Sequence, residues 1–266
     1  MSANENDIER SASEERRKIR KGIYILPNLL TSASLFGGFY AIIASIKGEY
    51  EFAAIIIVIC ACFDGLDGRV ARMTGSTSKF GMEYDSLSDL VAFGAAPAIL
   101  MHQWALSEFG RYGTLAAFIF LVCGALRLAR YNVQTSMEVS KDFNGLPITI
   151  AASGVGTTIV FLYHTGHGDI TKHITTLILV YTLSFLMVSN IKYYGFKEMG
   201  LSERKPFIFL VGVILLLLMV VAEPEKMLFL IAVVYIVSGP LGIILSSKRR
   251  KLAWISLADA LHLKHK

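Results

Sequence analysis

The sequence contains few cysteines and lacks several features of secreted or multidomain proteins. Its three cysteines lie inside apolar runs and form no Cys-x-x-Cys or Cys/His set, so they are expected to be packing residues (Cys60, Cys62 and Cys123). The first 22 residues are polar and charged, and the apolar run after them is too long for a cleavable signal peptide. Neither a low-complexity linker nor an internal repeat is visible, so an inverted-repeat transporter gains no support.

Charged residues are missing from long stretches of the chain, including residues 52–63 and 90–106. Hydrophobic residues make up 54% of the 266 residues, and the mean hydropathy is +0.54. This composition is typical of membrane proteins, so the net charge of +5 is interpreted through topology and not as a nucleic-acid-binding surface. We therefore expect an all-α, polytopic bundle in contact with the lipid bilayer.

Eight membrane-spanning helices of about twenty residues each are expected. They are placed at residues 24–46, 52–71, 85–106, 112–131, 147–165, 173–193, 206–222 and 227–246. The expected organisation is a basic segment at 1–22, one membrane domain at 23–247 and a basic tail at 248–266. If the N-terminus is cytoplasmic, 22 of the 26 Lys and Arg residues fall on the cytoplasmic side. This asymmetry predicts a protein of the cytoplasmic (inner) membrane with both termini in the cytoplasm.

Four aspartates lie between residues 64 and 89, at the predicted cytoplasmic edge of the membrane. Asp64 and Asp67 are three residues apart. Asp85 and Asp89 are four apart, so each pair can share one face of a helix. Two helices joined by the short polar turn at 75–78 can point all four carboxylates at one place, where a hard divalent cation would offset their repulsion. Capping of two helices would explain one or two of these acids, and a transporter's cation site is the stronger alternative.

The residues from Asp64 to Asp89 follow a longer pattern, Asp-x-x-Asp-Gly-x-x-Ala-Arg, eight residues, then Gly-x-x-x-Asp-x-x-x-Asp. This pattern resembles the signature of the CDP-alcohol phosphatidyltransferases, a family of integral membrane enzymes. The resemblance implies CDP-diacylglycerol as lipid donor and Mg²⁺ or Mn²⁺ as cofactor. It also implies that the four aspartates are metal ligands, with Asp89 additionally acting as general base on the acceptor hydroxyl.

The same resemblance implies a binding surface for the CDP-linked lipid. Gly68 would let the nucleotide approach the helix backbone, and Arg72 would reach phosphate from the same face. Asn28 and Thr31 are three apart at the start of the first span and would help to hold the cytidine diphosphate. Ser78 matches a position that contacts the donor, although a helix cap or turn role alone would also explain it.

Two further stretches, residues 124–132 and 143–147, resemble the phosphatidylserine synthase branch of the family, the membrane-embedded type. This implies L-serine as acceptor, release of CMP and a homodimer. Arg127 and Arg130 are three apart, and a bidentate arginine suits the carboxylate that serine carries. Asn144 could add a hydrogen bond. Glycerol 3-phosphate or an inositol phosphate as acceptor, and a cation-coupled transporter, remain alternatives.

The distribution of basic residues predicts which side of the membrane each loop faces. A single cysteine introduced near Lys79, in an otherwise cysteine-free chain, should be shielded from an impermeant thiol reagent in intact cells. One introduced near Gly168 should react. Both should react after permeabilisation, which controls for buried thiols. Labelling of the Lys79 site in intact cells would contradict the orientation and the cytoplasmic position of the aspartates.

Overall fold

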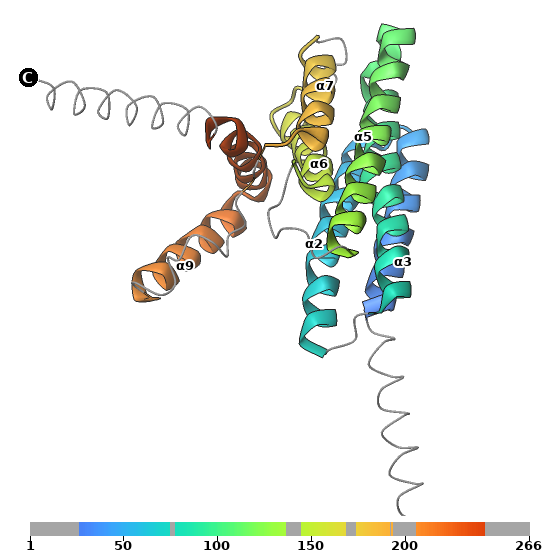
Figure 1. The fold of residues 1–266 in the computed structure, drawn as a ribbon. Helices are drawn as coiled ribbons and strands as arrows, with labels where there is room; N and C mark the ends of the chain where they lie inside the picture. Colours follow the sequence, from blue (N-terminus) through green and yellow to red (C-terminus); the bar gives the residue numbers. More distant parts are fainter. Residues whose placement is uncertain are drawn as a thin grey trace, which may run out of the picture.

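The computed structural model describes residues 27–74, 78–136, 145–168, 174–191, 193 and 206–242. Within these residues every regular element is helical and no strand occurs, which confirms the all-α class (Figure 1). The basic segments expected at residues 1–22 and 248–266 lie outside the described residues.

The helices follow one another along the chain with short connections. A first helix, Pro27–Ile46, and a last helix, Pro224–Gly242, are named here by their residues. Between them lie α2 (Tyr50–Thr74), α3 (Lys79–Asp89), the π-helical turn η1 (Leu90–Ala95), α4 (Ala96–Trp104), the 3₁₀ turn η2 (Leu106–Phe109), α5 (Arg111–Ser136), α6 (Ile148–His164), α7 (Ile174–Val188) and α9 (Pro206–Ala222).

Each of the eight expected spans overlaps a helical segment. The expected span at 85–106 starts earlier in the structure, because the helical run begins at Lys79 and continues through the π-helical turn into α4. Three described helices are long and apolar enough to cross a membrane: Pro27–Ile46, Arg111–Gln134 and Pro224–Gly242. Three shorter helices are also apolar (Ile148–His164, Ile174–Val188 and Leu210–Ala222). This set of helices is that of a membrane protein.

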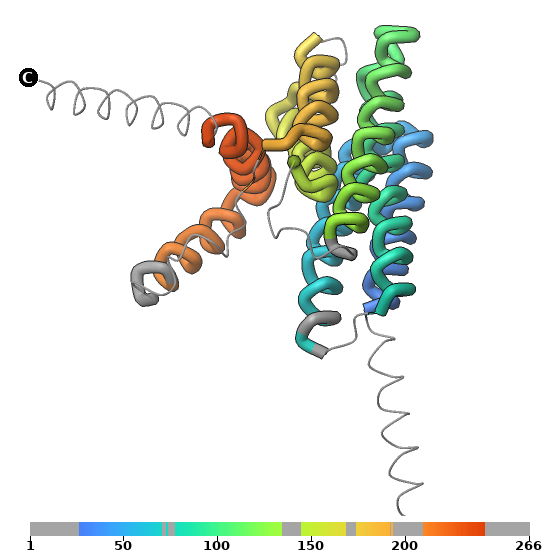
Figure 2. Tube along the Cα trace, viewed as in Figure 1, coloured from blue at the N-terminus to red at the C-terminus, as the bar shows by residue number. Residues whose placement is uncertain are grey.

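The bundle is held together where small residues allow helices to approach closely. α2 packs against α6, and α5 packs against α7 (Figure 2). A Cβ atom on Gly38 of the first helix would lie 2.5 Å from the Cα atom of Ala92 in η1. One on Gly156 of α6 would lie 3.0 Å from the carbonyl oxygen of Ala54 in α2. Small residues at such crossings are typical of membrane helices, where close packing drives association.

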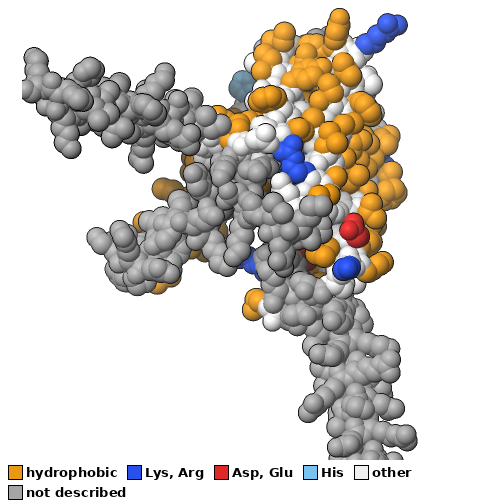
Figure 3. Space-filling model, viewed as in Figure 1, with side chains coloured by type: hydrophobic (Ala, Val, Ile, Leu, Met, Phe, Trp, Pro, Cys, Tyr) orange, Lys and Arg blue, Asp and Glu red, His pale blue; other side chains and the backbone are white. Residues whose placement is uncertain are grey.

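The surface of the bundle is largely apolar, and few charged side chains are visible on the face in Figure 3. Large side chains such as Phe36, Phe118 and Phe185 are 60–70% exposed. α9 extends away from the bundle, and its described side chains are nearly all exposed and apolar (Figure 1). An outer surface of this kind suits contact with lipid and not with water.

Candidate active site

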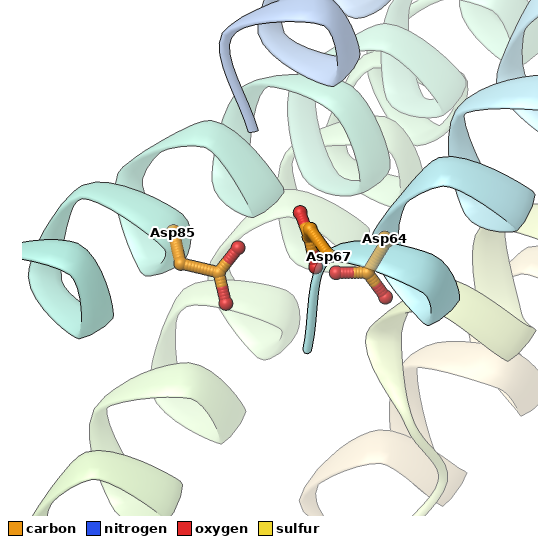
Figure 4. A group of neighbouring side chains, drawn as sticks. All are labelled: Asp64, Asp67 and Asp85. Carbon is orange, nitrogen blue, oxygen red and sulfur yellow. The ribbon is translucent and has the colours of Figure 1, made fainter. Parts of the chain in front are cut away.

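Three of the four signature aspartates converge from two helices. Asp64 and Asp67 project from α2 and Asp85 from α3, toward a common point (Figure 4). One carboxylate oxygen from each lies within 4.8 Å of the other two. Asp67 is the most enclosed, with 5% of its surface exposed. The i, i+3 spacing on α2 therefore brings both of its acids to α3, as the sequence predicts.

Asp89 joins this cluster one helical turn beyond Asp85. Its carboxyl group is in hydrogen-bonding contact with that of Asp64 and within electrostatic range of Asp85 and Asp67. Asp89 is also the last residue of α3, and the π-helical turn begins at Leu90. Such π turns are frequent at functional sites, because the extra residue per turn changes which way the neighbouring side chains point.

The start of α3 is fixed by Ser78. Its backbone is extended, and its hydroxyl accepts a hydrogen bond of 2.9 Å from the backbone N–H of Gly81. This is an N-cap, which satisfies one of the free N–H groups at a helix start. The observed contact of Ser78 is thus the capping role that its position in a polar turn also predicts.

The first helix supports both acid-bearing helices from the side. The Thr31 hydroxyl lies 3.2 Å from an oxygen of Asp67 and can donate to it. The Ser88 hydroxyl, on α3, donates to the carbonyl oxygen of Thr31 at 3.0 Å. Ser32 and Tyr84 share a hydrogen bond of 2.9 Å between their hydroxyls. These contacts fix α2 and α3 relative to each other. Thr31, expected at the nucleotide, therefore also orients a carboxylate.

The four carboxylates have the properties of a divalent-cation site. All of the converging side chains offer oxygen, which Mg²⁺ and Mn²⁺ prefer. Asp67 is buried and its hydrogen-bonded neighbour Thr31 is neutral, so the described contacts leave most of the negative charge uncompensated. A bound cation would remove this repulsion, and the hydroxyl of Thr31 would hold one ligand in place from outside the metal shell.

The space beside Gly68 is open. A Cβ atom built on Gly68 would meet no other atom within 4 Å, so a ligand can approach the backbone of α2 there. Asn28 lies across from the start of α3, where its side-chain oxygen is 3.6 Å from a Cβ atom built on Gly81. The side chain of Arg72 lies outside the described part of the structure. The described residues of the expected donor surface thus border the acid cluster.

Arg127 of α5 is half-buried beside the aspartates. It lies within electrostatic range of Asp89 and Asp64, and its guanidinium stands 6.0 Å from the ring centre of Tyr131. No hydrogen bond or ion pair joins it to any described residue. A half-buried guanidinium with five N–H donors and no protein partner can bind an anionic ligand.

Arg130 has a different environment from Arg127. Its guanidinium donates a hydrogen bond of 3.2 Å to the side-chain oxygen of Asn190, after the end of α7. Asn144 lies outside the described residues, but the adjacent Gly145 donates its N–H to the carbonyl oxygen of Ile191 at 2.9 Å. The two stretches that resemble the phosphatidylserine synthase branch therefore meet at the end of α7. Sequence analysis missed Asn190, because nothing in the local pattern marks it.

Replacing Thr31 by valine should weaken metal binding about 10- to 100-fold, because it removes the hydroxyl next to Asp67 while keeping the side-chain shape. Titration of the purified protein with Mn²⁺, followed by electron paramagnetic resonance, measures this affinity without requiring activity. Thr182→Val is the matched control, since Thr182 bonds only within its own helix α7. Equal Mn²⁺ affinity of the Thr31 variant and the parent protein would contradict the role of Thr31.

Comparison with known proteins agrees with this geometry. The sequence model of the CDP-alcohol phosphatidyltransferase family matches residues 24–196. The chain is 37% identical over 219 residues to a CDP-diacylglycerol–serine O-phosphatidyltransferase of Helicobacter pylori, covering 82% of this chain and 90% of that protein. It is 36% identical to the Methanocaldococcus jannaschii protein of the same name, over 82% of this chain and 94% of that one.

A third relative acts on a different lipid by its name. The chain is 38% identical over 179 residues to an archaetidylserine synthase of Methanothermobacter thermautotrophicus, covering 66% of this chain and 72% of that protein. The matched region contains all four aspartates, the first helix and Arg127. Sequence and structure thus agree that this chain belongs to the CDP-alcohol phosphatidyltransferase family.

Proposed function

We propose that this protein transfers a phosphatidyl group from CDP-diacylglycerol to the hydroxyl of L-serine and releases CMP. The observation that carries this proposal is the unpaired, half-buried guanidinium of Arg127 beside the four carboxylates. It supplies a reader for a carboxylate next to the cluster that would bind the donor's pyrophosphate. The names of the relatives support the same acceptor, since two bacterial or archaeal relatives matched over 82% of this chain are serine transferases by name.

The donor would bind at the cytoplasmic ends of the first helix, α2 and α3. Asp64, Asp67 and Asp85 would hold Mg²⁺ or Mn²⁺, with Asp89 close by. The bound ion would offset the negative charge of the pyrophosphate and of the departing CMP. The open space at Gly68 admits the nucleotide to the helix backbone.

Four other residues complete the proposed donor site. Asn28 and Thr31 would hold the cytidine diphosphate from the first helix, and Arg72 would pair with a phosphate. Ser78 shapes this surface by starting α3 and remains a candidate donor contact.

In the reaction, the serine hydroxyl oxygen attacks the phosphorus that bears the diacylglycerol. A new phosphorus–oxygen bond forms to serine, and the bond between this phosphorus and the CMP oxygen breaks. Asp89 would accept the proton that the serine hydroxyl loses. Its place at the end of α3, in contact with Asp64 and within range of Arg127, puts it between the donor and acceptor sides of the site.

On the acceptor side, Arg127 would bind the serine carboxylate with two parallel hydrogen bonds. Arg130 and Asn144 were proposed with it. The hydrogen bond from Arg130 to Asn190 indicates a supporting role for Arg130, which would fix the end of α7 near the acceptor. Glycerol 3-phosphate and inositol phosphate carry a dianionic phosphate, which a single free guanidinium neutralises less completely than it does a carboxylate.

The membrane arrangement completes the proposal. The protein would be an eight-span homodimer of the inner membrane, with its membrane domain at residues 23–247, both termini in the cytoplasm and the aspartates at the cytoplasmic surface. The clustering of basic residues on that side supports this orientation. Nucleotide, metal ion and serine are then all available from the cytoplasm.

An acceptor screen tests the function directly. Purified protein in detergent with Mn²⁺ and labelled CDP-diacylglycerol should release CMP when L-serine is added and form a lipid that contains serine. Ethanolamine, which lacks the carboxylate, should be a poor acceptor. Transfer to glycerol 3-phosphate but not to serine would refute the serine assignment. Absence of CMP release with every acceptor would favour a cation-coupled transporter.

Asp89→Asn should lower kcat about 10²- to 10⁴-fold, because the amide cannot accept the proton of the attacking hydroxyl. Donor binding should change much less than kcat. Asp64→Asn is the informative comparison, since loss of a metal ligand should also raise the Mn²⁺ concentration needed for half-maximal activity. A kcat close to that of the parent protein would remove Asp89 from the role of general base.

A further inference from the structure

The last helix, Pro224–Gly242, lies entirely outside the region matched by the family, yet it is docked firmly on the bundle. The rings of Phe229 and Phe161 of α6 are stacked, with centres 4.5 Å apart and planes 6° apart. Lower on the same two helices, a Cβ atom on Gly154 would come within 2.8 Å of the Ile236 side chain. These contacts fix both the height and the rotation of the last helix against α6.

A second set of contacts involves Tyr193, which follows α7 and is 4% exposed. Its hydroxyl donates to the carbonyl oxygen of Ile236 at 3.1 Å. Its ring fills the space over Gly239, where a Cβ atom would lie 2.4 Å from the ring. It is also stacked on Tyr235, with ring centres 5.7 Å apart and planes 18° apart. Tyr193 therefore holds the ring of Tyr235 in one orientation.

This docking places Tyr235 on the acceptor side of the candidate active site. Tyr235 and Arg127 lie within electrostatic range of each other, although they are 108 residues apart in the sequence. The Tyr235 hydroxyl, like the Arg127 guanidinium, has no hydrogen-bond partner among the described residues. The hydroxyl is not sealed in the interior either, since Ser34 is the only described residue with a fully buried side-chain oxygen or nitrogen that lacks a partner.

We propose that Tyr235 is a second acceptor-binding residue, whose hydroxyl donates a hydrogen bond to the same carboxylate that Arg127 binds. This inference rests on the proposed transfer to serine. A carboxylate has about four lone-pair positions, and a bidentate guanidinium uses two of them. A neutral phenol can therefore add a hydrogen bond without adding charge next to Asp89. The last helix would thus form part of the acceptor site, and α7, through Tyr193, would hold it there.

Tyr235→Phe tests this inference because it removes only the hydroxyl and keeps the ring stacked on Tyr193. The KM for L-serine should rise by roughly tenfold or more, as expected for loss of a hydrogen bond to a charged group. The KM for CDP-diacylglycerol and the thermal stability in detergent should stay within about twofold and a few degrees of the parent protein. A purely structural role of Tyr235 would not separate these quantities in this way.

Coupling to Arg127 provides a second measurement. If both side chains bind one carboxylate, Tyr235→Phe should raise the KM for serine much less in an Arg127→Lys background than in the parent protein. Equal effects in the two backgrounds would show that the two residues act on different groups and would overturn the proposal.

Two further variants separate this site from general effects of losing a tyrosine hydroxyl. Tyr181→Phe is the matched control, since Tyr181 contacts Tyr112 near the opposite end of α5 and should leave the KM for serine unchanged. Tyr193→Phe removes the hydrogen bond that docks the last helix and should reduce stability. If the parent protein shows no CMP release that depends on serine, the proposed function fails. Normal serine transfer with an unchanged KM in Tyr235→Phe would refute the role of Tyr235 alone.

Discussion

Repulsion among four carboxylates is the constraint on which the rest of the structure depends. Two unit charges about 4 Å apart interact by about 4 kcal/mol at an effective dielectric constant of about 20, and several such pairs occur here at once. The oxygens of Asp64, Asp67 and Asp85 lie within 4.8 Å of one another, so the bundle must force them together. The first helix does so by bonding to both acid-bearing helices, and a divalent cation would convert the repulsion into binding energy.

The same negative charge explains how a half-buried arginine can be stable without a direct partner. Arg127 lies within electrostatic range of Asp64 and Asp89 but forms no ion pair with a described residue. A direct ion pair would occupy the guanidinium and leave it unable to bind an acceptor. Attraction at longer range stabilises the charge while keeping the N–H donors free. Arg130, three residues on, is instead bound to Asn190, so two arginines of one motif have separate roles.

The acid cluster could be predicted from the sequence because its geometry is local. The i, i+3 and i, i+4 spacings place each pair of aspartates on one helix face, and the short turn at 75–78 brings the faces together. The all-α class and the approximate helix positions followed from apolar runs in the same way. The π-helical turn after Asp89 could not be predicted, since apolar residues of that type also form regular helix. The bond of Thr31 to Asp67 joins positions 36 residues apart, and no periodic pattern reveals it.

The acceptor side of the site shows where such prediction stops. Arg127, the end of α7 and the last helix are brought together only by packing between helices that, in sequence, look uniformly apolar. Tyr235 differs from the surrounding apolar residues by one hydroxyl group, which hydropathy does not register. What gives it a defined position is the stack on Tyr193 and the close approach of Gly239. The donor side is thus encoded within one short stretch of chain, whereas the acceptor side depends on contacts between distant segments. Change of acceptor within such a fold would then require changes in the packing of the later helices and not in the aspartate motif.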